Sequence, residues 1–226
     1  MERHFDDDLN ELKNNLLEMA ALVEKSINQS IEALKKQDKK LAEAVIKEDE
    51  KIDEMELMNE EKAIELLALY QPMAIDLRYI TMSIHITGEL ESIADMAVNI
   101  SHRVINLAEL PMLKPLVDIP KLSTIAQKMV KSAIDSFVNR NESLAKEVIE
   151  SDRDADNLRN IIMKELIYDY MVKDGTTAPR AVPLLLVARD LERMCDHATA
   201  IAEDVIYMIR AKMVRHHPEK LQNDDK

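Results

Sequence analysis

The chain has 226 residues, enough to bury a sizeable core, with only 2 glycines, 7 prolines and 3% aromatic residues. All-β folds need glycine-rich turns with β-branched or aromatic strands, and doubly wound α/β folds need a glycine-rich phosphate loop, so this composition disfavours both. The formal net charge of −13 argues against nucleic acid as a partner, because that binding needs a basic surface. The helix-forming residues that remain predict an all-α protein.

Apolar residues in steps of three and four predict a first helix over about residues 9–34, with Asp38 as the N-cap of the next. That second helix, 41–70, ends at Gln71-Pro72 because proline lacks an amide donor and clashes with the preceding turn. A third helix continues to about residue 110. Because three prolines fall within 111–120, we expect no helix to pass through this segment and interpret it as a linker.

The second half repeats this order. It predicts helices over about 122–138, 142–173 and 179–214, with a break at Asp174-Gly175 and Pro183 in the first turns of the last helix. The tail from 216 is polar and expected to fray. The domains predicted are therefore residues 1–112 and 113–226, each a three-helix unit.

The two halves also match in detail. The segment ELESIADMAVNI at 89–100 aligns with DLERMCDHATAI at 190–201, an offset of 101 residues, and Asp49 and Asp53 align with Asp152 and Asp156 at an offset of 103. Similar offsets at two separate helices indicate tandem duplication of a three-helix bundle, giving six long helices with pseudo-two-fold symmetry.

The matched segments share carboxylate pairs spaced four residues apart, which a helix stacks on one face about 6 Å apart. The pairs are Asp49/Asp53, Glu91/Asp95, Asp152/Asp156 and Glu192/Asp196. Converging carboxylates suit hard cations such as Mg²⁺, Mn²⁺, Ca²⁺ or iron. Acidic residues make up 43 of 226, so roughly eight such pairs arise by chance, and solvated surface charge is the competing interpretation. Recurrence at corresponding positions sets these four apart.

The other candidate groups are weaker. Cys195 is the only cysteine, which excludes an intramolecular disulfide, and we expect a small packed side chain rather than a nucleophile. Arg78 and Arg180 fall at similar places in the two halves, where they could hold an anion or pair with carboxylates. The longest apolar run, 181–188, is far shorter than the ~20 residues that span a bilayer, although peripheral membrane association stays open.

At the matched segments the chain resembles the PhoU family of bacterial phosphate-signalling regulators. The run LERMCD at 191–196 resembles the family signature Leu-Glu-Arg-Ile-Gly-Asp, and Asp76-Leu-Arg upstream of the first copy is also family-like. The first copy lacks the arginine, and Ala94 and Cys195 replace the usual glycine, while the acidic residues are intact.

This resemblance implies a non-enzymatic, cytoplasmic protein, often a homodimer, that acts with the phosphate ABC transporter and a phosphate-sensing histidine kinase. It implies regulation of phosphate uptake and negative regulation of the phosphate-starvation response. It also implies metal binding, of Mg, Mn, Fe or another ion, on the acidic motifs. Carried over by position, the ligands are Asp49, Asp53, Glu91, Asp95, Asp152, Asp156, Glu192 and Asp196.

Two other functions stay open at this point. The first is a ferritin-like, carboxylate-bridged oxidase or iron store, although that class uses Glu-x-x-His and no histidine here has glutamate three residues before it. The second is a plain helical scaffold with solvated acidic faces.

Overall fold

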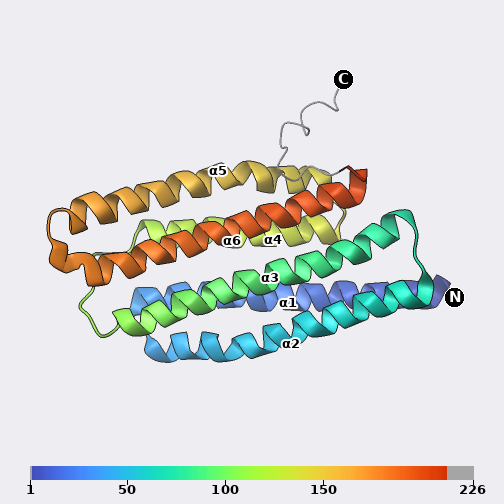
Figure 1. The fold of residues 1–226 in the computed structure, drawn as a ribbon, viewed down its shortest axis with the longest axis horizontal. Helices are drawn as coiled ribbons and strands as arrows, with labels where there is room; N and C mark the ends of the chain where they lie inside the picture. Colours follow the sequence, from blue (N-terminus) through green and yellow to red (C-terminus); the bar gives the residue numbers. More distant parts are fainter. Residues whose placement is uncertain (1, 213–226) are drawn as a thin grey trace, which may run out of the picture.

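The computed structural model describes residues 2–212, and over that range it is helical without a strand (Figure 1). Six long helices follow the predicted order. They are α1 (Glu2–Lys36), α2 (Lys39–Tyr70), α3 (Ala74–Leu107), α4 (Asp118–Val138), α5 (Glu142–Lys164) and α6 (Ala178–Arg210), with a π-helix, η1 (Glu165–Met171), and a 3₁₀ turn, η2 (Gly175–Thr177). The all-α prediction is confirmed.

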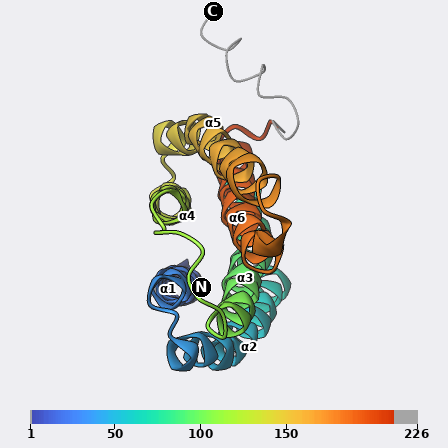
Figure 2. The same ribbon diagram turned by 90° about the vertical axis from the view of Figure 1, so that its left-hand side faces the viewer.

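The helices lie along the long axis of an elongated molecule, in two units of three. Helices α1, α2 and α3 pack on one another, as do α4, α5 and α6. Viewed from one end, α3 lies beside α6 and α1 beside α4, so the two units meet along two helix pairs (Figure 2).

One apolar core runs through both units, because its members come from all six long helices. Val23, Ile93 and Leu191, for example, are fully buried in it. Between the units, the ring of Tyr79 on α3 stacks on Phe137 of α4 with centroids 4.6 Å apart. The two halves therefore share their hydrophobic interior.

The turns after α1 and α4 have the same construction. Gln37 and Arg140 both adopt left-handed backbone with φ of 51°, and each stands directly before the N-cap of the next helix. The caps are Asp38, as predicted, and Asn141, and each side chain accepts a hydrogen bond of 3.1 Å from the backbone amide three residues on. The duplication is thus visible in the backbone as well as in the sequence.

The linker lies a few residues earlier than expected. Helix α3 ends at Leu107 rather than near 110, and α4 begins at Asp118 rather than near 122. No helix passes through 111–120, as expected, although α4 includes the last three of these residues. Pro120 is the third residue of α4. Proline is tolerated there because amides in the first turn of a helix have no intrahelical acceptor.

The fifth helix also differs from the prediction of one α-helix to about 173. It changes at Glu165 into the π-helix η1, which is wider by one residue per hydrogen-bonded turn. Lys114 of the linker pairs with Glu165, and its ammonium lies 6.0 Å from the ring centre of Tyr170. The linker is therefore attached to this irregular turn.

The last helix ends at Arg210, with Ala211 in left-handed backbone, rather than near 214. The tail expected to fray, 216–226, lies outside the described residues. Among the helices of the described range, none combines the length and apolar character needed to cross a bilayer.

Candidate functional site

The first acidic cluster lies between α2 and α3. The pairs Asp49/Asp53 and Glu91/Asp95 face one another there. Burial, and then the nearby charges of Asp53 and Asp95, raise the pKa of Asp49 to about 6. Burial, Asp95 and Glu56 likewise raise the pKa of Glu91. The four predicted residues of the first half therefore form one electrostatic group.

Glu56 is a fifth member that the carboxylate spacing alone does not identify. Burial and the charges of Glu60, Asp53 and Asp95 raise its pKa. Its Oε1 atom lies 3.9 Å from the point where a Cβ on Gly88 would stand, so this carboxylate reaches across to α3.

The second acidic cluster lies between α5 and α6 and contains the other four predicted residues. Burial, together with the charges of Asp196, Asp156 and Glu192, raises the pKa of Asp152 to about 6. Burial, Glu192 and Asp156 also raise the pKa of Asp196. Both predicted groups of four are thus brought together, one in each half.

Arg159 belongs to the second cluster and was also missed. It lies one turn after Asp156 on α5, and its Nη2 donates to Glu192 Oε1 at 2.6 Å and to Asp156 Oδ1 at 3.3 Å. The sequence held a usable signal, because residues three positions after Asp53 and Asp156 share their helix face. Extending the 103-residue alignment by one turn reaches Glu56 and Arg159.

The side chains as they stand do not form a finished coordination sphere. Within residues 2–212, no three Asp, Glu, His or Cys side chains converge closely enough to hold a metal ion. The clusters are open groups of carboxylates, in which any ligand role needs side-chain rotation at the helix surface.

Between the units, α3 and α6 are joined by ion pairs. Arg103 pairs with the buried Asp190, and His197 Nδ1 lies 2.5 Å from Glu89 Oε2. The pKa of Asp190 is raised overall, because the effect of burial exceeds the opposing effect of the Arg103 charge. These contacts place the second cluster next to the seam between the units, and sequence periodicity gave no sign of them.

Cys195 and Arg78, two of the weaker candidates, take part in packing and in contacts between helices. Cys195 is fully buried, its Sγ donates to Leu191 O, and burial raises the pKa of the thiol far above its usual range. The Nε of Arg78 donates to Met208 O at 2.8 Å, which fastens α3 to the end of α6. Neither residue is arranged as part of a reactive group.

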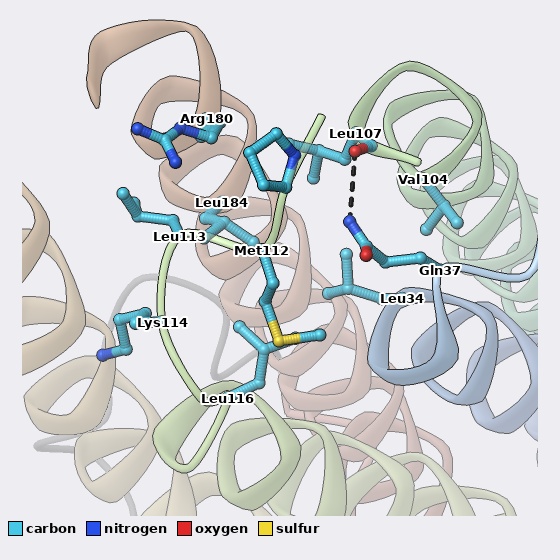
Figure 3. Close-up of a pocket in the computed structure, with 11 residues that line it drawn as sticks. Leu34, Gln37, Val104, Leu107, Met112, Leu113, Lys114, Leu116, Arg180 and Leu184 are labelled. Carbon is cyan, nitrogen blue, oxygen red and sulfur yellow. Dashed lines mark hydrogen bonds between the residues drawn. The ribbon is translucent and has the colours of Figure 1, made fainter. Parts of the chain in front are cut away.

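Arg180 lines a small cavity where the linker passes between α1, α3 and α6 (Figure 3). The cavity measures about 20 Å³ and has mostly apolar walls, with the Gln37 amide donating to Leu107 O at 3.2 Å. A volume of this size holds about one water molecule, so it cannot accept an organic ligand.

Comparison with known proteins gives a consistent result. The PhoU domain model matches residues 16–104 and 119–205, on either side of the predicted boundary at 112/113, which stays a prediction. A phosphate-specific transport system accessory protein PhoU homolog of Aquifex aeolicus is 43% identical over 92% of this chain and 94% of its own length. A homolog of the same name from Zymomonas mobilis is 33% identical over 98% of this chain and 92% of its own.

Solved structures agree with this assignment. The crystal structure of PhoU from Pseudomonas aeruginosa superposes with a TM-score of 0.88 at 34% identity, covering 92% of this chain and all of that one. That of the phosphate transport system regulatory protein PhoU from Streptococcus pneumoniae gives a TM-score of 0.85 at 25% identity, over 93% of this chain and 99% of that one. The family model matches both halves and the relatives span nearly the whole chain, so the resemblance seen in the sequence is confirmed and the chain belongs to the PhoU family.

Proposed function

We propose that this protein regulates phosphate uptake and keeps the phosphate-starvation response off when phosphate is plentiful, by coupling the phosphate ABC transporter to a phosphate-sensing histidine kinase. The observation that carries the proposal is similarity over the whole chain to relatives named as accessory proteins of the phosphate-specific transport system. The names of these relatives directly support an accessory role in phosphate transport. Regulation of the starvation response and contact with the kinase extend the proposal beyond those names.

In this proposal the protein acts by binding rather than by catalysis. The two acidic clusters contain carboxylates and one guanidinium, and the single thiol is buried in the core. A carboxylate group of this kind changes its charge when it takes up a cation or a basic partner. Binding can therefore alter how α2 packs on α3, or α5 on α6.

The proposal includes a divalent or iron cation held by the predicted ligands of either cluster. Carboxylate oxygens are the donors that hard cations prefer, and the guanidinium between Asp156 and Glu192 indicates that positive charge is favoured there. When bound, such an ion supplies positive charge that offsets the repulsion between carboxylates. The chain's own part is to hold acidic side chains from two helices within reach of one another.

We further propose a cytoplasmic homodimer that meets the transporter at the membrane surface. Exposed apolar side chains that recur along α2 and at η1 are candidates for such an interaction surface, because contiguous apolar patches mark interfaces. They include Leu57, Ile64 and Leu69 on α2 and Tyr168 and Val172 at η1.

Affinity pull-down and a promoter reporter test this function together. The tagged protein, expressed at native level in phosphate-replete cells, is expected to copurify with the transporter and the kinase, and its deletion to switch on a phosphate-starvation promoter. If the clusters are regulatory, a variant with four substitutions is also expected to switch on the phosphate-starvation promoter. The substitutions are Glu91→Gln, Asp95→Asn, Glu192→Gln and Asp196→Asn. Glu50→Gln with Glu54→Gln, an exposed pair of the same spacing on α2, is the control. Full repression in the deletion strain, with neither partner recovered, would contradict the proposal.

A further inference from the structure

The exposed apolar side chains of the long helices are concentrated on α2 and α5. Leu57 and Ile64 of α2 are 62% and 59% exposed, and Ile161 of α5 and Tyr168 of η1 are 56% and 62% exposed. Within residues 2–212, α1 and α4 expose no large apolar side chain. Helices α2 and α5 are the corresponding helices of the two repeats, and they lie at opposite ends of the helix array (Figure 2).

On each of these helices the apolar side chains belong to a row of four exposed positions. We call the first row the α2 face; it consists of Leu57, Glu61, Ile64 and Ala68. The second row, on α5 and η1, is the α5 face and consists of Asn157, Ile161, Lys164 and Tyr168. Steps of three and four residues keep side chains on one side of a helix, and both rows advance by four, three and four.

The two rows match each other when one is read backwards. With the helices antiparallel, Glu61 stands opposite Lys164, and Ile64 stands opposite Ile161. With the helices parallel, the same steps would set Glu61 against Ile161 and Lys164 against Ile64. Placing a charge against an apolar side chain removes water from it without supplying a partner, so the antiparallel arrangement is favoured.

The α2 face is negatively charged. Residues 54–68 contain five glutamates and one basic residue, Lys62. This lysine is turned toward α1, where its Nζ lies 3.0 Å from Asp8 Oδ1 and 2.6 Å from Glu11 Oε2. In the part of the chain that the structure describes, the carboxylate of Glu61 has no hydrogen-bond or ion-pair partner. Its charge is therefore open to a cation from outside the chain.

The α5 face has the opposite charge. Residues 157–168 contain one acidic residue, Glu165, and Lys114 of the linker pairs with it. Lys164 is exposed, and across the described range, 2–212, its ammonium has neither a hydrogen-bond nor an ion-pair partner. The two faces thus each combine exposed apolar side chains with one unpaired charge, and the two charges are of opposite sign.

From this complementarity we propose that the α2 face of one copy of the chain binds the α5 face of a second copy, with the two helices antiparallel. The inference rests on the proposed association of two copies and specifies its surfaces. Charge identifies the occupant, because two α2 faces would bring glutamates together without a cation, and two α5 faces would bring lysines together without an anion. The apolar side chains on either side of Glu61 and Lys164 exclude water from the ion pair and so strengthen it.

The contact is head-to-tail, because α2 and α5 lie at opposite ends of the helix array (Figure 2). A pair of copies joined in this way still has one α2 face and one α5 face unoccupied, so further copies can add. The pair is then the first member of an open series, and the mass of the assembly is expected to rise with protein concentration past that of two chains.

Charge reversal on each face tests the proposal. The purified full-length protein is followed by sedimentation velocity and light scattering over a wide range of concentration. Glu61→Lys and Lys164→Glu, each alone, are expected to weaken self-association by about tenfold or more, because each sets like charges opposite one another. An equimolar mixture of the two variants is expected to restore wild-type association, since every contact between unlike variants again joins opposite charges.

Matched controls separate this effect from net charge and from misfolding. Glu43→Lys and Arg153→Glu make the same charge changes at exposed positions of α2 and α5 outside the two faces, and are expected to leave self-association unchanged. Mixing these two control variants is likewise expected to change nothing. Circular dichroism checks that each variant retains its helices.

A wild-type protein with the mass of one chain at every concentration would overturn the association of copies, and this inference with it. Three other results would overturn the contact between the α2 and α5 faces while leaving association in place. They are association that either single reversal fails to weaken, a mixture that fails to restore it, and a mass that stops rising at two chains. The two kinds of failure are therefore distinguishable.

Discussion

Removing the charge of Asp49 is expected to stabilise the metal-free protein. The pKa of this half-buried carboxyl rises from its ordinary 3.8 to about 6, with burial as the main cause. One pKa unit corresponds to about 1.4 kcal/mol, so this rise in pKa makes ionisation at pH 7.5 cost at most about 3 kcal/mol. Solvent screening at this half-exposed position reduces the cost to about 1 kcal/mol. Asp49→Asn avoids that cost while keeping nearly the same shape.

The assay is urea and thermal unfolding at pH 7.5 in excess chelator, followed by circular dichroism. A gain of 1 kcal/mol raises the melting temperature of a chain of this size by about 2–4 °C. Glu50→Gln, at the exposed neighbouring position on α2, is the control and is expected to stay within about 0.5 kcal/mol of the wild type.

Added Mn²⁺ is expected to remove this advantage. A free-ion concentration about 100 times the dissociation constant stabilises the wild type by about 2.7 kcal/mol, and a variant that binds about tenfold more weakly gains about 1.4 kcal/mol. The difference of about 1.3 kcal/mol offsets the gain seen in chelator. A variant less stable than the wild type in chelator would refute the reasoning, because it would mean that the carboxylate is stabilised by its neighbours rather than repelled.

Three further predictions concern the rest of the fold. Phe137→Ala is expected to lower the free energy of unfolding by about 3–5 kcal/mol in urea titrations, because it empties a fully buried site against Tyr79, whereas Phe137→Leu is expected to lower it by less than about 1.5 kcal/mol. Glu142→Gln is expected to cost about 1 kcal/mol at pH 7, because hydrogen bonds from Arg210, and then Lys146, lower the pKa of Glu142 below its ordinary 4.5. The stabilisation is fully present above pH 4.5 and is lost as the pH falls through the lowered pKa. The unfolding curves of the variant and the wild type should therefore converge in acid. Cys195 is expected to resist thiol reagents in the native protein and to react on unfolding, measured with a chromogenic disulfide reagent.

Each of these three has an outcome that would count against it. A Phe137→Ala variant as stable as the wild type would mean that the neighbouring helices can close the space. A constant gap between the Glu142→Gln and wild-type curves from neutral to acidic pH would exclude an ionised Glu142 as the stabilising group. Rapid native labelling of Cys195 would mean that α6 opens readily at this point.

Short-range sequence patterns predicted most of the helices and their ends correctly. The N-cap at Asp38 and the helix end before Pro72 follow from side chains adjacent in sequence, and the structure has both. Pro120 was misjudged because a proline reads as a helix breaker unless the helix begins just before it. The π-turn at Glu165–Met171 has no periodicity of its own, because it depends on how the end of the fifth helix packs against α6 and the linker.

For the candidate site, the sequence predicted which carboxylates share a helix face, and the structure brings both groups of four together. The spacing of residues within one helix does not show which side chains of a neighbouring helix lie opposite them. Arg159 was therefore missed, since its partner Glu192 is 33 residues away on α6, and so was the pairing of Arg103 with Asp190 across the seam. Such contacts depend on the rotation of one helix against another, which the hydrophobic pattern defines only to within a face.

The apolar core that passes without interruption from one repeat to the other makes the whole chain the unit of folding. A protease that cuts the linker after Leu107 would leave two fragments that stay associated, because α3 remains packed on α6 and α1 on α4. Either fragment alone would expose the apolar faces that these helices now bury, so we expect an isolated repeat to be less stable than the intact chain. The two repeats thus share one interior, while each keeps an acidic cluster of its own.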